Sequence, residues 1–204
     1  MRKPDRQTIK QLLRSVAHVA ALIPFVLLLL DWLWGGFGAD PVREITLRTG
    51  KAAIILLLLS LAITPLKMFF GWNQLHPLRR IFGLYAFGYV VLHLLAFVWL
   101  DYGWNGAQIR EAIFEKRYAL VGFAAFLILL PLALTSTRWA MRKLGKRWAT
   151  LHKGAYMAAV LAVLHYALLV KQVYTQPLIL ALLLSLLLLV RWRPLRQRIV
   201  NWRR

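Results

Sequence analysis

Long apolar stretches alternate along the chain with short polar segments rich in basic residues. Six stretches of 16 to 20 residues cover residues 16–34, 52–70, 81–100, 118–135, 154–170 and 177–192. An α-helix rises about 1.5 Å per residue, so stretches of this length suit the roughly 30 Å hydrocarbon core of a bilayer. The pattern predicts an all-α fold, an integral membrane bundle of six transmembrane helices. Because the connecting segments are short, we expect one domain over residues 1–204.

The basic residues indicate the orientation of these helices. The chain holds 27 Lys and Arg residues but 7 Asp and Glu residues. When the loops are assigned alternately to two sides, 20 of the 27 basic residues fall on the side of the two termini. Since cytoplasmic segments of membrane proteins carry the excess of Lys and Arg, we expect both termini to be cytoplasmic.

Composition narrows the classes of partner. A net charge of +20 would ordinarily suggest binding to nucleic acid. However, 60% of the residues are hydrophobic, and the basic residues stand in short blocks between apolar runs. We therefore expect the lipid bilayer, and no nucleic acid, to be the partner of this charge. The absence of Cys excludes disulfides, iron–sulfur clusters and thiolate zinc sites.

Ionisable residues inside the spans are the candidates for chemistry, because burying them in a membrane is costly. His18, Asp31, His93 and His165 lie within predicted spans, and His152 stands at the cytoplasmic entrance of the fifth. His18 suits helix packing as well as it suits a function. Asp31 lies near the outer end of its span and is interpreted as an interfacial helix-end residue.

His93 and His165 are predicted to lie at the same depth. His93 follows Arg80 by thirteen residues and His165 follows Lys153 by twelve, which corresponds to about 20 and 18 Å of helix rise. Their spans run in the same direction, so the two rings can approach one centre from opposite sides. Two imidazoles alone make a poor structural zinc site, whereas a porphyrin needs only axial ligands. The economical hypothesis is a b-type haem with two axial histidines.

His152 is a further candidate ligand, for a second centre near the cytoplasmic face. It precedes His165 by thirteen residues, but on an ideal helix the two rings point in different directions. At the matching depth on the third span stand Arg79 and Arg80, where a histidine would be needed. These arginines are most simply cytoplasmic anchors, and partners for a haem propionate or a flavin phosphate are the alternative. His76, beside Pro77 in a predicted loop, is a weaker substitute.

Several short blocks, in order along the chain, carry a family resemblance. They are Gly38-Ala39-Asp40-Pro41, Thr49-Gly50-Lys51-Ala52-Ala53, Thr64-Pro65-Leu66, Arg79-Arg80-Ile81-Phe82-Gly83-Leu84, Leu134-Thr135-Ser136-Thr137, Leu144-Gly145-Lys146-Arg147-Trp148, Leu151-His152 and His165-Tyr166. With these blocks the chain resembles the MsrQ (formerly YedZ) family, within the ferric-reductase-like transmembrane group. The resemblance covers nearly the whole chain.

The resemblance implies a multi-pass protein of the bacterial inner membrane that carries haem b, one or two per chain, and is associated with FMN. Such a subunit takes electrons from a quinol or a cytoplasmic flavin reductase and passes them to a periplasmic molybdopterin subunit, MsrP, which repairs oxidised methionines. The family's haem histidines fall on His93, His152 and His165. Methionine sulfoxide chemistry then belongs to the partner, so no catalytic residue is expected in this chain.

Two other classes of function remain open at the level of sequence. One is a different redox role on the same scaffold, either a stand-alone transmembrane ferric reductase or a quinol-oxidising cytochrome b. The other is a non-redox membrane scaffold or transporter with structural histidines. Broken helices would favour a transporter, but the candidates are confined to Thr64-Pro65 and Pro131.

Overall fold

The computed structural model describes residues 5–170, 175–192 and 197, and in these residues all regular structure is helical. Four helices are long and apolar enough to cross a membrane, which confirms an all-helical membrane protein. The elements are α1 (Arg6–Trp34), α2 (Pro41–Phe70), η1 (Asn73–Leu75), α3 (His76–Leu95), η2 (Ala96–Asp101), α4 (Gly106–Glu115), α5 (Arg117–Leu134), α6 (Arg138–Leu144), α7 (Lys146–Leu151), α8 (Gly154–Leu169) and α9 (Thr175–Leu189).

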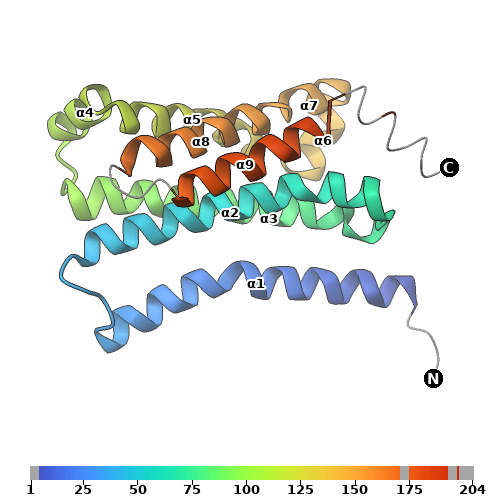
Figure 1. Cartoon of the computed structure of the whole chain (residues 1–204), viewed down its shortest axis with the longest axis horizontal. Helices are drawn as coiled ribbons and strands as arrows, with labels where there is room; N and C mark the ends of the chain where they lie inside the picture. Colours follow the sequence, from blue (N-terminus) through green and yellow to red (C-terminus); the bar gives the residue numbers. More distant parts are fainter. Residues whose placement is uncertain (1–4, 171–174, 193–196, 198–204) are drawn as a thin grey trace.

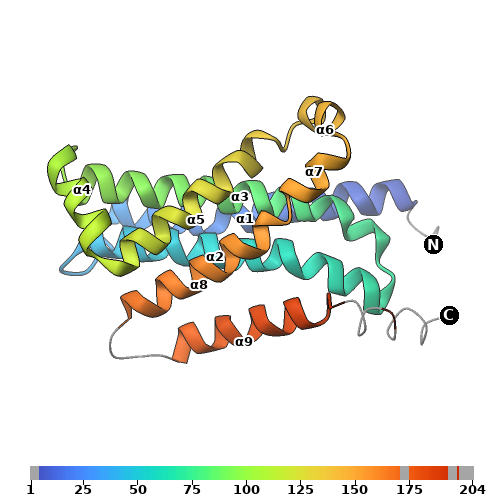
Figure 2. The same ribbon diagram turned by 90° about the horizontal axis from the view of Figure 1, so that it is seen from above.

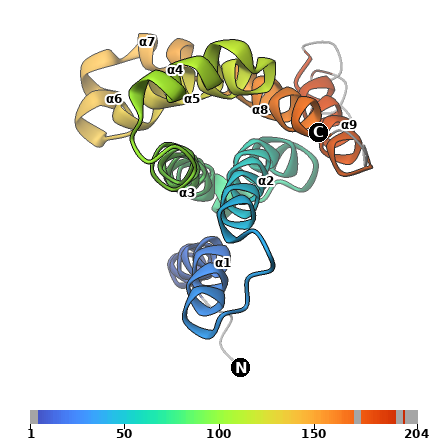
Figure 3. The same cartoon turned by 90° about the vertical axis from the view of Figure 1, so that its left-hand side faces the viewer.

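The long helices run along one common direction. Figure 3 looks along them and shows α2 and α3 in the centre, with α1 on one side and α5, α8 and α9 in a row on the other. Figure 2 shows α8 running beside α5, and α9 beside α8. The first turn of α1 and the last turn of α9 lie at the same end of the bundle (Figure 1).

The observed helices differ from the predicted spans mainly at their ends. The second span was predicted to begin at residue 52, but α2 begins at Pro41, where Asp40 caps the helix by accepting a hydrogen bond from the Arg43 amide. A span predicted from hydropathy stops at the first charges, whereas a helix continues into the headgroup region. At 16 and 15 residues, α8 and α9 are shorter than the four spanning helices, so six crossings remain a prediction.

Some predicted loops contain helices. Short helices α4, α6 and α7 occupy connecting segments between the predicted spans. His76, which was expected in a loop, is the first residue of α3. Pro77 follows it within the first turn, a position where proline costs no helical hydrogen bond.

Small residues let the helices approach closely at the centre of the bundle. Ala21, Ala86, Ala158 and Ala159 are almost completely buried, and they surround a core that includes Leu61. Apolar side chains are no better solvated by one another than by lipid tails. Close backbone packing of small residues is therefore the main source of helix association here.

Two tyrosines of α3 attach α1 to the bundle. The Tyr89 hydroxyl accepts a hydrogen bond from the Phe25 amide at 2.9 Å and donates one to the Ala21 carbonyl at 2.8 Å. It is therefore inserted into one step of the α1 backbone ladder, beside Pro24. One turn earlier on α3, Tyr85 forms a 3.1 Å hydrogen bond with His18, which gives this histidine a role in helix packing.

Two further polar contacts fix helix ends. Asp31, predicted as an interfacial residue, pairs with Arg48, which also bonds Glu44 at 2.9 Å. Pro65 lies inside α2, and because proline has no amide hydrogen, the Leu61 carbonyl lacks its normal helical donor. The Arg191 guanidinium donates to that carbonyl and lies over the Tyr156 ring.

Candidate functional site

His93 of α3 and His165 of α8 face each other in the interior of the bundle. Their ring centroids are 6.0 Å apart and the ring planes are nearly perpendicular, at 85°. A metal–imidazole bond is about 2 Å long. Two such bonds, plus the distance from each coordinating nitrogen to the centroid of its own ring, add up to roughly the observed separation of the centroids. The geometry therefore suits two axial ligands of one metal centre.

The backbone fixes which nitrogen of each ring points to that centre. The Nδ1 of His93 lies 2.8 Å from the Thr46 carbonyl of α2, and the Nδ1 of His165 lies 2.6 Å from the Tyr118 carbonyl of α5. A carbonyl can only accept, so each Nδ1 carries the hydrogen. Each Nε2 is left with a lone pair, and a donated Nδ1–H hydrogen bond is the usual support of a metal-bound imidazole.

Two glycines provide room for the rings. A Cβ atom on Gly50 would lie 3.0 Å from the Nδ1 of His93, and one on Gly122 would lie 2.7 Å from the Nδ1 of His165. Both distances are shorter than ordinary contacts between carbon and nitrogen. These glycines therefore allow each ring to approach the neighbouring helix closely enough to reach its backbone carbonyl.

The rings open into a cleft of about 1110 Å³ between α2, α3, α5 and α8. Its inner part is apolar and includes Leu57, Ala86 and Leu129, while its rim carries charged side chains that include Arg43 and Lys51. A deep apolar cleft with a few polar groups at its mouth is typical of a cofactor site.

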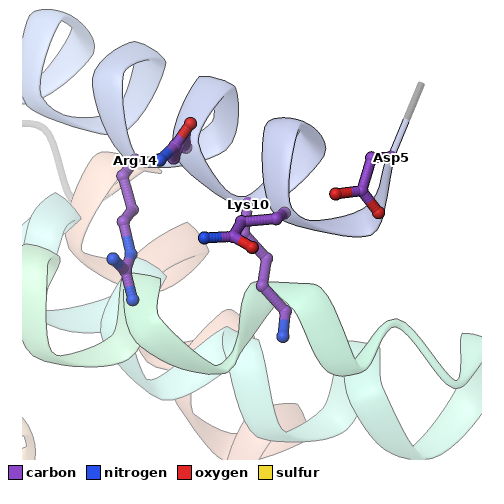
Figure 4. Close-up of a pocket in the computed structure, with 5 residues that line it drawn as sticks. Asp5, Lys10 and Arg14 are labelled. Atoms are coloured by element: carbon purple, nitrogen blue, oxygen red, sulfur yellow. The ribbon is translucent and has the colours of Figure 1, made fainter.

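A second hollow of about 450 Å³ lies along the first turns of α1, lined by Asp5, Gln7, Lys10, Gln11 and Arg14. Figure 4 shows Lys10 and Arg14 extending from α1, with Asp5 at the start of the helix. The residues that line it include no histidine, and in the described part of the chain no three His, Asp or Glu side chains are grouped to bind a metal. We interpret it as part of the headgroup-level basic surface.

An internal repeat of 72 residues underlies the site. The offset relates His93 to His165, Gly50 to Gly122 and the acceptor Thr46 to Tyr118. Two short motifs repeat at the same offset: Gly-x-Ala-Ala at residues 50–53 and 122–125, and Val-Leu-His at residues 91–93 and 163–165. The α2/α3 pair and the α5/α8 pair therefore carry the same residue types at equivalent positions, and the cleft lies between them. This signal was present in the sequence and would have identified both glycines.

His152 is not brought to the cleft. It caps α7, its ring stacks on Trp148 with centroids 3.9 Å apart, and its Nε2 lies 3.2 Å from the Thr135 hydroxyl. Burial, and secondarily the positive charge of Arg79, lower the pKa of the His152 imidazole. The repeat places Arg80 at the position equivalent to His152, so this depth has no second histidine.

Arg79 and Arg80 lie in the first turns of α3. The Arg79 carbonyl accepts a 2.7 Å hydrogen bond from Ser60, which ties α3 to α2 at this end. Arg79 is partly buried, whereas Arg80 is exposed. Neither arginine forms an ion pair with another described residue, so both charges are available to an anion.

This architecture defines a class of membrane protein. Residues 49–163, which cover most of the two helix pairs and end two residues before His165, match the family described as "Ferric reductase like transmembrane component". No solved structure gives a significant match.

Curated relatives narrow the class further. The chain is 45% identical over 186 residues to the "Protein-methionine-sulfoxide reductase heme-binding subunit MsrQ" of Rhodospirillum rubrum, covering 91% of this chain and 89% of that protein. The equally named protein of Bordetella pertussis is 44% identical over 76% of this chain and 75% of its own. That of Xanthomonas campestris pv. campestris is 45% identical over 91% and 88%. The chain belongs to the MsrQ family.

Proposed function

We propose that the chain binds a b-type haem between His93 and His165 and carries electrons through the membrane for a methionine-sulfoxide reductase system. The observation that carries this proposal is the 6.0 Å approach of two imidazoles whose Nδ1 atoms are both bonded to backbone carbonyls. The relatives' printed names, which call them haem-binding subunits, agree with it. When bound, haem supplies a one-electron carrier.

The residues of the cleft orient the two histidine rings and exclude water. The Nδ1–H bonds to Thr46 and Tyr118 orient the rings and make each Nε2 a stronger ligand. Apolar residues such as Leu57 and Leu129 keep water from the inner part of the cleft. Low polarity and axial ligation are two of the factors that set the potential of haem iron. One such centre fits the cleft, and a second at His152 would require displacing Thr135 from its Nε2.

The spectrum of the purified protein tests this assignment. We expect the wild type to show a b-type haem spectrum in the oxidised state and after dithionite reduction, and His93→Ala and His165→Ala to lose it. His18→Ala is the matched control, because this histidine lies within α1, bonds Tyr85 and does not line the cleft. Full haem content in either cleft variant would refute the assignment, as would the absence of haem from the wild type expressed with adequate haem.

We further propose that the protein resides in the bacterial inner membrane. There it receives electrons from a quinol or a cytoplasmic flavin reductase and delivers them to the periplasmic molybdopterin subunit MsrP. Segments 35–51 and 101–117 form the outer surface on which MsrP would dock. Reduction of purified MsrP by the pre-reduced protein tests the pathway. A chain that reduces ferric chelates but never MsrP would instead be a stand-alone ferric reductase.

FMN is the second cofactor of this proposal, and Arg79 and Arg80 are its proposed phosphate partners. They are cationic, stand at the predicted cytoplasmic end of α3 and have no acidic partner among the described residues. Arg79→Gln and Arg80→Gln are expected to lower the flavin content of the purified protein without changing its haem content. Unchanged flavin in the double variant would exclude this position.

A further inference from the structure

The two halves of the cleft differ at its edges. The 72-residue repeat that superimposes the histidines also pairs Lys51 with Phe123 and Leu94 with Tyr166, and all four residues line the cleft. Lys51 and Tyr166 border the edge between α2 and α8, while Leu94 and Phe123 border the edge between α3 and α5. One edge is therefore cationic and polar, and the equivalent edge is apolar.

Hydrogen bonds organise the polar edge. The Lys51 ammonium donates to Gln176 Oε1 at 3.1 Å, and the Tyr166 hydroxyl donates to the same oxygen at 2.8 Å. These contacts join α2, α8 and the first turn of α9. In the described part of the chain the ion pairs are those of Arg48 with Asp31 and Glu44, so the partner of Lys51 is a neutral amide. The Lys51 ammonium and the Tyr166 hydroxyl thus donate to the same neutral oxygen, and no described carboxylate pairs with Lys51.

The other charged residues near the mouth of the cleft include Asp40, Arg43, Arg48 and Asp101. Asp40 caps α2, and Arg48 is held by two carboxylates. Arg43 and Asp101 also line the rim, and Arg43 lies two helical turns nearer the start of α2 than Lys51. Lys51 directly follows Gly50, the glycine under the His93 ring. Among the cations of α2 that line the cleft, Lys51 is thus the nearest in sequence to the glycine that contacts the His93 ring, and it has no acidic partner among the described residues.

Among the described residues, Leu94 and Phe123, which the repeat pairs with Tyr166 and Lys51, carry neither a charge nor a hydrogen-bond donor. Phe123 stacks with Phe126 at a centroid distance of 6.2 Å, and Phe126 stacks with Phe87 of α3 at the same distance. A b-type haem carries two carboxylates on one edge and hydrocarbon substituents on the opposite edge. Burying a carboxylate against the phenylalanines would cost several kcal/mol, whereas an ammonium and a hydroxyl stabilise it.

We propose that Lys51, which Gln176 positions, and Tyr166, whose hydroxyl turns its single hydrogen from Gln176 to the ligand, bind the haem propionates. They thereby fix the rotational setting of the haem, with its carboxylate edge toward α2, α8 and α9. This proposal rests on the proposed function, because it presumes haem between His93 and His165. It adds the residues that recognise the haem periphery and the edge at which its negative charge lies. Lys51 then also offsets the propionate charge, which favours the reduced iron.

Reconstitution with two haems tests the proposal. The apoprotein, purified from haem-depleted cells, is titrated with haem b and with its dimethyl ester, which lacks the propionate charges. We expect the wild type to bind haem b more tightly than the ester. In Lys51→Gln this preference falls by about tenfold or more, the usual value of a charge-assisted hydrogen bond. In the haem b complex, Lys51→Gln also lowers the midpoint potential, and Lys51→Arg restores it.

Lys116→Gln is the matched control. Lys116 is another lysine of the predicted outer side and bonds the Tyr102 hydroxyl at 2.8 Å, but it does not line the cleft. An equal preference for the two haems in wild type and Lys51→Gln would overturn the proposal, and so would an equal effect of Lys116→Gln. Tyr166→Phe provides a second measurement if Lys51→Gln does not fold. Retention of haem by His165→Ala would instead refute the underlying function.

Discussion

At the scale of single residues, two backbone carbonyls decide how the histidines are presented. Thr46 and Tyr118 hold the Nδ1 atoms, so both lone pairs point into the cleft. This arrangement depends on the absence of a side chain at Gly50 and Gly122. The geometry of the proposed metal site therefore depends on Thr46, Tyr118, Gly50 and Gly122 as well as on the two imidazoles.

Gly122→Ala should disturb this geometry. The new methyl group would lie 2.7 Å from the His165 Nδ1 and must push the ring away from the Tyr118 carbonyl. We expect lower haem occupancy and altered electron paramagnetic resonance of the oxidised haem, because the angle between the imidazole planes changes. Gly88→Ala on α3 is the control, since a Cβ there meets no atom within 4 Å. Identical spectra for Gly122→Ala and wild type would show that the glycine is not required.

The sequence predicts the positions of the two histidines better than it predicts the carbonyls and glycines that hold their rings in place. Helix rise alone places His93 and His165 at one depth, because the basic residues mark the membrane boundary. Thr46 and Tyr118 act through their main chains, and a backbone carbonyl leaves no signature in residue type. The glycines could have been found from the repeated Gly-x-Ala-Ala motif. Helix spacing already separated His152 from the His93/His165 centre, but its contacts with Trp148 and Thr135 could not be predicted, because they depend on the path of α6 and α7.

At the scale of helices, α1 is the least buried of the four helices that are long enough to cross a membrane. Most of its large apolar side chains are exposed, as expected for a lipid-facing helix. Its specific attachment comes from the Tyr89 hydroxyl, which satisfies both the Phe25 amide and the Ala21 carbonyl next to Pro24. The insertion of a side chain into the backbone ladder is tolerated in a membrane because the hydroxyl satisfies both backbone groups that it separates.

Tyr89→Phe should therefore destabilise the protein. Loss of the hydroxyl leaves a buried donor and a buried acceptor unsatisfied, at a cost of about 1 to 3 kcal/mol. For a chain of this length the Tm should fall by roughly 3 to 10 °C, measured by thermal unfolding in detergent. Tyr102→Phe is the control, because Tyr102 lies outside the helices and bonds the exposed Lys116. A Tyr89→Phe variant as stable as the control would exclude this role.

At the scale of the whole molecule, the two helix pairs form the cleft, and of the two outer helices only α9 reaches it among the described residues. The family match spans residues 49–163, which leaves α1, the first turns of α2, the end of α8 with His165, and α9 outside it. Of these, α9 contributes Gln176 to the polar edge, while α1 packs against α3 and α2 away from the cleft. A helix outside the two pairs can thus add a polar side chain to the edge of the cleft while His93 and His165 stay unchanged.

Whether α8 and α9 cross the membrane needs a direct test, because both are shorter than the other membrane helices. If both cross, the C-terminal end of α9 is on the same side as the start of α1, as their position at one end of the bundle indicates. We expect green fluorescent protein fused after residue 204 to fluoresce, which it does only in the cytoplasm. Alkaline phosphatase inserted within α4, on the predicted periplasmic side, should be active. A dark C-terminal fusion with an active phosphatase there would mean that one of the two helices does not cross. The polar edge formed by Lys51, Tyr166 and Gln176 would then have to be reconsidered, because it requires α9 to begin at the outer mouth of the cleft.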